Sequence, residues 1–278
     1  MSDITADITG DITGEELMAI TASRLLADHK VVFAGVGMPL LASAVARHRH
    51  APHLTIVLEG GIIGTSLRPG KLPISTNEMR AAYGAQMLTD ITDIFLYAQR
   101  GFFDYGFLGA AQVDMHGNIN TSVIGSMDRP RVRLPGSGGA NDIISLCNEV
   151  LIVTQHEPRR FVDRVDFVTS PGYLSGDDSR ARAGLVTGRL GAVVTDLALL
   201  DFEPASRRMR LRGLQPGVSV AQVRAQTGFE LLVSDEITEL TPPSPEEIAI
   251  YRELRDGPAA VAGTVGATGP DRVAAGPG

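Results

Sequence analysis

The chain has 278 residues, enough for one large domain or two small ones, and 44% hydrophobic with 21% charged residues is ordinary globular composition. A formal charge of −7 argues against nucleic acid or an anionic membrane as the main partner, because both require clustered Lys and Arg. A single cysteine, Cys147, excludes an internal disulfide and a cysteine-based metal cluster. We find no signal peptide and no apolar run of about 18 residues, so we expect a soluble cytoplasmic protein.

Both ends of the chain have compositions typical of disordered tails. The triplet Asp-Ile-Thr recurs at 3–5, 7–9 and 11–13, and so short and acidic a repeat cannot form a core. From 256 to 278 the sequence is almost entirely Gly, Ala, Pro, Val and Thr. We therefore predict tails at 1–13 and 256–278 that flank one domain at 14–255.

The first part of this domain alternates between helical and strand patterns. Apolar spacing predicts a helix at 14–28, a strand at 31–36 and a second helix at 40–49 that begins after Pro39. The break between the last two contains Gly35 and Gly37, and such a loop can turn helix N–H groups towards an anion or a carbonyl. The other interpretation is that the glycines only pack the helix on the strand.

The segment 54–64, LTIVLEGGIIG, is the strongest candidate for a reactive site. Residues 54–58 are apolar and predict a parallel strand buried on both faces, and Glu59 follows where the strand ends. A carboxylate taken partly out of water there has a raised pKa and a raised nucleophilicity. Gly60 and Gly61 then let a ligand approach the backbone. The alternative is a solvated Glu before a glycine turn.

The middle of the chain predicts a helix at 77–89, a strand at 94–98 and then a hairpin. Aromatic residues cluster at 102–107 as a packed patch or a pocket wall. The hairpin joins strands at 108–113 and 119–124 through a turn that contains His116, which we expect in solvent.

A glycine-rich turn, Gly-Ser-Gly-Gly-Ala-Asn at 136–141, follows a short extended piece at 131–134 and opens a helix predicted at 142–148. Such a turn directs several amide hydrogens towards one point, so it is a candidate oxyanion hole or phosphate cradle. The alternative is a flexible turn. Cys147, within the apolar pattern of this helix, is interpreted as a small core residue and not as a nucleophile.

The last part of the domain predicts a strand at 150–154, and His156 just after it lacks a second histidine at metal-binding spacing. We interpret His156 as a hydrogen-bonded structural residue. A long loop extends from a predicted strand at 165–169 to Gly191. The further predicted elements are strands at 192–196, 199–202 and 209–212 and helices at 218–227 and 244–254. The fold class is α/β, an open, mostly parallel sheet flanked by helices.

Together with the strand, Glu and glycine turn at 54–61, three longer segments resemble the β subunit of class I CoA-transferases, closest to the glutaconate type. They are GAAQVDMHGNINTSVIG at 109–125, GSGGAND at 136–142 and TQHEPRRFVDRVDFVTSPGY at 154–173. The resemblance spans 20–254 and implies the CoA-transferase fold. It also implies Glu59 as the catalytic residue and the turn at 136–141 as part of the active site.

The resemblance implies a ping-pong transfer of CoA between an acyl-CoA and a carboxylic acid, through a glutamyl anhydride and a glutamyl-CoA thioester. A second, α-type chain would complete the pocket, and no metal or redox cofactor is required. Relatives that use 3-oxo acids carry Glu-Asn-Gly and the glutaconate type Glu-Ser-Gly, whereas here the middle residue is glycine. The expected residues that bind substrate or stabilise an oxyanion are Gly37, Gly60, Gly61, Gly138, Gly139 and Ala140.

Two other interpretations stay open at the sequence level. Members of the superfamily that lack the glutamate hydrolyse or decarboxylate CoA thioesters, and a non-enzymatic chain could bind acyl-CoA with the acid incidental. A distal carboxylate of a dicarboxylic substrate would need a cation. The candidates, each of which is more readily interpreted as a surface or interface residue, are Arg68, Arg80, Arg100 and Arg131.

Overall fold

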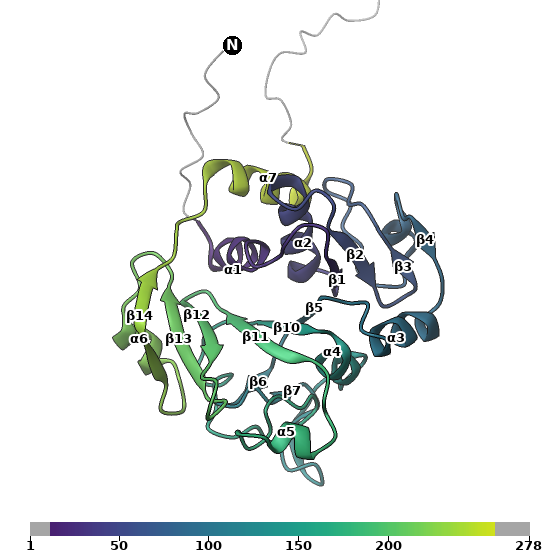
Figure 1. The fold of residues 1–278 in the computed structure, drawn as a ribbon. Helices are drawn as coiled ribbons and strands as arrows, with labels where there is room; N and C mark the ends of the chain where they lie inside the picture. The colour runs from purple at the N-terminus through teal and green to yellow at the C-terminus, as the bar shows by residue number, and fades with distance from the viewer. Residues whose placement is uncertain (1–11, 259–278) are drawn as a thin grey trace, which may run out of the picture.

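The computed structural model describes residues 12–258 (Figure 1), and nearly all of both predicted tails lies outside the described residues. Its centre is a ten-stranded sheet. In spatial order the strands are β14 (Leu232–Glu239), β13 (Met209–Leu214), β12 (Ala198–Phe202), β11 (Arg189–Val194), β10 (Glu149–Val153), β5 (Tyr105–Leu108), β1 (Val31–Phe33), β2 (Thr55–Leu58), β3 (Ile62–Ile63) and β4 (Met87–Leu88).

The middle of the sheet is parallel and its flanks are largely antiparallel. The strands β2, β1, β5, β10 and β11 run parallel to one another, whereas β3 and β4 on one side and β12 and β13 on the other pair antiparallel. The last strand, β14, is again parallel to β13. The predicted fold class, an open and mostly parallel α/β sheet, is therefore confirmed.

Helices cover both faces of the parallel strands, which explains why these strands are apolar throughout. On one face, α1 (Gly14–Ser23) and α2 (Met38–Arg49) pack on inward residues such as Val32 and Ile56. On the other face, α3 (Ile91–Gln99) and α4 (Ala140–Leu146) pack on the alternate residues, such as Phe33 and Val57. Because successive side chains of a strand point to opposite faces, a strand covered on both faces must be apolar at every position.

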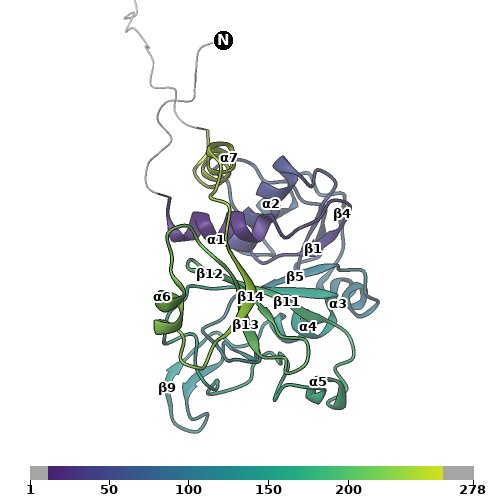
Figure 2. The same ribbon diagram turned by 60° about the vertical axis from the view of Figure 1, so that its left-hand side comes forward.

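A third helix, α7 (Pro245–Asp256), packs against α1 and α2 on the outside of the first layer (Figure 1), and Figure 2 shows the same group from the side. The predicted cap Ser244 accepts from the Glu247 amide, and Glu247 also accepts from Arg24 at 2.7 Å. In return, Arg252 of α7 donates to Glu16 in the first turn of α1 at 2.6 Å. Each capping carboxylate therefore also ties the two helices together.

Smaller elements lie beside the second face. The predicted hairpin is present as β6 (Gln112–Val113) and β7 (Ile119–Asn120), and β8 (Val123–Gly125) pairs with β9 (Pro130–Arg133). The remaining short elements are the 3-10 turn η1 (Met79–Ala82), α5 (Ser179–Arg182) and α6 (Val220–Ala225). Among residues 12–258, no helix combines the length and the apolarity needed to cross a membrane.

Three sequence predictions were wrong. The predicted helix at 77–89 is only η1 followed by β4, and the predicted strand at 94–98 lies inside α3, which Asp90 caps. The segment 165–169 forms no strand because Asp166, Phe167 and Val168 remain exposed, and only an isolated bridge at Ser170 follows. Short apolar runs do not distinguish helix from strand by periodicity, and caps decided these cases. The strand β14 was not predicted.

Candidate active site

Glu59 occupies the first position of a tight hairpin loop. The loop of residues 59–61 joins β2 to the antiparallel β3, and the Gly61 amide donates to the Leu58 carbonyl oxygen at 3.2 Å. Gly61 adopts a φ of +94°, which a residue with a side chain rarely adopts. The chain therefore reverses directly after Glu59, and its carboxylate stands at the carboxyl edge of the parallel strands.

The segment that follows presses on this turn and leaves no room for side chains there. A Cβ atom on Gly60 would lie 2.3 Å from the Asn77 Oδ1 atom, and one on Gly61 would lie 2.1 Å from the Thr89 carbonyl oxygen. Both glycines are therefore required by packing. Asn77 fills the space where a residue other than glycine would project at position 60, which gives a structural reason for the Glu-Gly-Gly sequence.

The glycine-rich turn before α4 contacts the carboxylate itself. A Cβ atom on Gly139 would lie 3.1 Å from Glu59 Oε1 and 2.7 Å from the Phe95 ring. Gly138, with a φ of +48°, has no atom within 4 Å of its Cβ position, and Ala140 is the half-buried first residue of α4. The fold thus brings the segments around residues 59 and 139 together, although 80 residues separate them in the sequence.

The loop at 35–37 ends the neighbouring strand. In the parallel register Phe33 pairs with Val57, so this loop and Glu59 leave the same edge of the sheet. Gly37, with a φ of +78°, caps α2 without a side-chain hydrogen bond, and a Cβ atom there would meet nothing within 4 Å. Gly37 therefore borders open space, whereas Gly139 touches the Glu59 carboxylate.

The Glu59 carboxylate is half-buried and, within residues 12–258, accepts no hydrogen bond and forms no ion pair. Desolvation raises its pKa, and the negative charge of Asp142 in the first turn of α4 raises it further. A carboxylate without donors keeps its lone pairs free, and a raised pKa increases its basicity. These properties suit a nucleophile.

An apolar groove adjoins the carboxylate between α3 and α4. Its volume is about 430 Å³, and its lining includes Ile91, Phe95, Leu96, Leu146 and Asp142. Phe95 also touches the Gly139 position, and the charge of Asp142 acts on Glu59. The groove therefore opens beside the reactive group and offers it an apolar wall.

A second groove, of about 590 Å³, lies over the segment 68–88 that packs on the glycine turn. Two of the four candidate arginines, Arg68 and Arg80, line it together with Lys71 and Tyr83. The Arg68 guanidinium lies 3.8 Å above the Tyr83 ring, and Arg80 pairs with Glu78. The other two candidates, Arg100 after α3 and Arg131 on β9, are exposed and line neither groove.

Two of the remaining candidates are structural, as predicted. His156 is only 3% exposed, lies between the Thr195 and Thr227 hydroxyls at 3.1 and 2.9 Å, and stacks on Phe161. Burial lowers the pKa of His156 to about 4 and raises the pKa of the fully buried Cys147 thiol to about 12. Neither group can act as a charged nucleophile at neutral pH.

His116 does not lie in solvent as expected. It is half-buried, and its Nδ1 atom lies 3.2 Å from the Arg207 carbonyl oxygen. Sequence reasoning missed Asn77, Phe95 and Asp142 at the site. The first two fall in the segments whose secondary structure was predicted wrongly. Only Asp142 carried a usable signal, because it follows the glycine-rich turn directly.

Comparison with known proteins agrees with this geometry. The model of the coenzyme A transferase family matches residues 15–226. The chain is 38% identical to the B-type chain of 3-oxoadipate CoA-transferase from Pseudomonas knackmussii, over 90% of this chain and 96% of the relative. It is 36% identical to the B-type chain of glutaconate CoA-transferase from Acidaminococcus fermentans, over 87% of this chain and 92% of the relative.

Solved structures give the same result. The crystal structure of glutaconate coenzyme A-transferase from Acidaminococcus fermentans superimposes with a TM-score of 0.82 at 33% identity, over 88% of this chain and 95% of that one. The decarboxylase AibA/AibB gives a TM-score of 0.74 at 28% identity, over 87% of this chain and 95% of that one. The chain belongs to the coenzyme A transferase family, resembles its B-type chains along most of its length, and is a CoA-transferase.

Proposed function

We propose that this chain is the β-type component of a two-chain CoA-transferase that moves CoA from an acyl-CoA to a carboxylic acid by way of Glu59. The observation that carries this proposal is the contact between Gly139 and the Glu59 carboxylate, which is half-desolvated and free of donors. A carboxylate held in this way can attack a thioester carbonyl and form a covalent intermediate.

The proposed transfer has two halves. Glu59 attacks the acyl-CoA carbonyl carbon, the C–S bond breaks, and CoA thiolate leaves an acyl-glutamyl anhydride. The thiolate attacks the glutamyl carbonyl, the first acid departs as a carboxylate, and a glutamyl-CoA thioester remains. The acceptor carboxylate then attacks this thioester, and the same steps in reverse give the new acyl-CoA and free Glu59. No net oxidation or proton change occurs.

Each step passes through a tetrahedral oxyanion, which requires hydrogen-bond donors close to Glu59. The backbone amides of Gly138 and Gly139 are the nearest candidates because their turn contacts the carboxylate, and the loop that contains Gly37 is the second. One such donor contributes ~3 kcal/mol to the stability of a transition state. Water must be excluded as well, since the anhydride would otherwise hydrolyse.

A second, α-type chain would provide that exclusion. Large apolar side chains beside the glycine turn are exposed in the single chain, with Met79 at 79%, Leu88 at 61% and Ile91 at 47%. Such a surface is typical of a protein contact. Both relatives compared above carry names that make them one of two kinds of chain in their enzymes, which supports a partner chain here.

We propose a dicarboxylic acid as one substrate. The names of both relatives, 3-oxoadipate and glutaconate CoA-transferase, denote dicarboxylic acids. The apolar groove at Phe95 would hold the carbon chain, and a cation is required for the distal carboxylate. Arg68 and Lys71 in the second groove are the nearest cations that form no carboxylate pair within the described residues.

The test is CoA exchange by the complex of this chain with its co-expressed α-type partner. Glu59→Ala should abolish exchange, and Glu59→Asp should retain a trace because its carboxylate is one methylene short. Glu236→Ala, at an exposed glutamate on β14, is the matched control and should exchange at the wild-type rate. Undiminished exchange by Glu59→Ala would exclude the proposed mechanism.

The similarity to the decarboxylase AibA/AibB keeps one rival function in view. A hydrolase or decarboxylase would release free CoA or carbon dioxide from an acyl-CoA without any acceptor acid. A CoA-transferase instead requires the acceptor and conserves the thioester. Measuring free thiol with and without the acceptor therefore separates the two functions in one experiment.

A further inference from the structure

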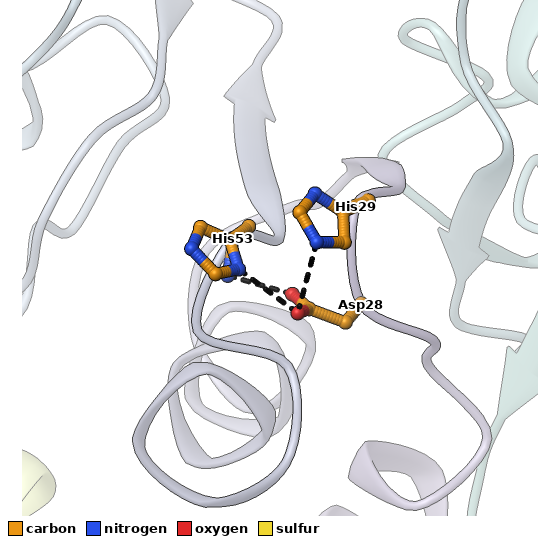
Figure 3. Close-up of side chains that lie close together, drawn as sticks. All are labelled: Asp28, His29 and His53. Carbon is orange, nitrogen blue, oxygen red and sulfur yellow. Dashed lines mark hydrogen bonds and ion pairs between the residues drawn. The ribbon is translucent and has the colours of Figure 1, made fainter.

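The amino ends of β1 and β2, at the opposite edge of the sheet from Glu59, carry a second group of chemically active side chains. Asp28 and His29 precede β1, and His53 precedes β2. Figure 3 shows the two imidazoles and the carboxylate pointing towards one another. All three side chains offer one ligand atom, and these atoms lie within 4.8 Å of one another.

Both imidazoles approach the same carboxylate oxygen. Asp28 Oδ2 lies 2.9 Å from His53 Nδ1 and 3.5 Å from His29 Nε2, and the two rings stack with their centroids 4.4 Å apart. The other oxygen, Oδ1, accepts from the His53 backbone amide at 2.6 Å. One oxygen is therefore fixed by the backbone, and the second faces both histidines.

The backbone places His29 in this group at some cost. His29 has a φ of +57°, a conformation that residues with side chains adopt infrequently. The neighbouring Lys30 pairs with Asp104 and directly precedes β1, so the conformation of His29 sets the direction of its side chain relative to a fixed strand. The three ligands thus come from two loops that the paired strands hold together.

The distances match the edges of a metal coordination shell. Ligand atoms at ~2.0–2.1 Å from a tetrahedral metal ion are ~3.3 Å from one another. The two oxygen–nitrogen distances, 2.9 and 3.5 Å, lie on either side of that value. Two imidazoles with one carboxylate form a ligand set that suits Zn²⁺ and similar divalent transition metals, and it does not suit Mg²⁺ or Ca²⁺.

We propose that Asp28, His29 and His53 bind one divalent transition metal ion, with Zn²⁺ as the expected ion and water as the remaining ligand. Asp28 Oδ2, His29 Nε2 and His53 Nδ1 are the ligand atoms. The rings are exposed, so a small rotation of either one lets both nitrogen lone pairs converge on the ion. The ion would fasten the loop before β1 to the loop before β2, and it takes no part in CoA transfer.

The experiment uses the full-length chain after treatment with a chelator, and Zn²⁺ alone as the probe. Calorimetric titration should show one saturable site, and Zn²⁺ should raise the midpoint of thermal unfolding. His29→Ala and His53→Ala should each weaken binding by at least ~10-fold, as expected for the loss of one ligand. His48→Ala, at an exposed histidine on α2, should bind as the wild type does.

A second measurement identifies the coordination. Co²⁺ in place of Zn²⁺ should give the visible absorption of a tetrahedral centre with nitrogen and oxygen ligands, and His53→Ala should lose it. The proposal is overturned if the wild-type chain shows no saturable binding. It is equally overturned if His29→Ala and His53→Ala bind Zn²⁺ as tightly as His48→Ala does.

Discussion

Two carboxylates, Glu59 and Asp114, have raised pKa values for the same first reason, desolvation, yet their surroundings are opposite. Asp114 is 5% exposed and accepts hydrogen bonds from the His116 amide at 3.0 Å, the Asn118 amide at 3.1 Å and the Asn118 side chain at 2.9 Å. Glu59 is less buried and, within the described chain, accepts none.

The difference separates structural from reactive acids. Asp114 organises the turn between β6 and β7, because its partner Asn118 also binds the backbone of Gly172 and Leu174 and ties the following loop to that turn. Its oxygens are occupied by hydrogen bonds of the fold. Glu59 instead faces a glycine turn and an apolar groove. A raised pKa alone therefore does not identify a catalytic acid, and a lack of hydrogen-bond donors is the additional criterion.

The strongest test of this contrast is Glu59→Gln, which preserves shape and removes the nucleophile. We expect exchange to fall by ~10⁴-fold or more, as when other covalent nucleophiles are removed. The folded protein should not be less stable. The pKa of Glu59 is higher in the folded state, so its ionised form costs stability as the pH rises above the unfolded-state value. A thermal unfolding midpoint at pH 7 below that of the wild type would contradict this.

The reciprocal change, Asp114→Ala, should damage the fold and spare the chemistry. It leaves the Asn118 side chain and two buried amides without an acceptor, and we expect a loss of ~3 kcal/mol in the free energy of unfolding. Denaturant unfolding measures this loss, with Asp163→Ala as an exposed control. If the folded Asp114 variant lost exchange as completely as Glu59→Gln does, the contrast would fail.

A smaller effect is expected from Gly139→Ala, which sharpens the role of the glycine turn. The new methyl group would lie 3.1 Å from Glu59 Oε1 and 2.7 Å from Phe95, so one of these groups must move. A displacement of ~1 Å at the reacting group can cost ~10²-fold in rate, and we expect a loss of ~10- to 100-fold in kcat. Gly109→Ala, with its nearest contact at 4.0 Å, is the control. Equal rates for the two variants would remove Gly139 from the site.

The smallest effect concerns the charge of Asp142. Asp142→Asn removes the second cause of the raised pKa of Glu59 and leaves desolvation, the larger one, unchanged. Exchange requires the ionised carboxylate, so activity falls as the pH drops through this pKa. We expect the acidic limb of the kcat/KM profile to move to lower pH by less than ~1 unit. An acidic limb that stays in place in Asp142→Asn but moves in the exposed control Asp128→Asn would contradict the assignment.

The sequence was sufficient where one residue type serves one purpose. An apolar strand that ends in Glu59 and a glycine-rich turn that contains Gly139 predicted two pieces of the site, and the parallel topology accounts for their meeting. Sequence reasoning failed between residues 77 and 99, because the apolar run of α3 is too short to show a helical period and Asp90 had not been recognised as its cap. Phe95 and Asn77 could not be placed at the site without the fold.

Trapping the covalent intermediate tests the central claim most directly. The complex with the α-type partner is incubated with acyl-CoA and then reduced with borohydride, which converts a glutamyl-CoA thioester to an alcohol, and the peptides are analysed by mass spectrometry. We predict that the alcohol forms at Glu59, only after exposure to acyl-CoA, and not in Glu59→Gln. A complex that exchanges CoA at the full rate while every Glu59 side chain stays unmodified would contradict the account.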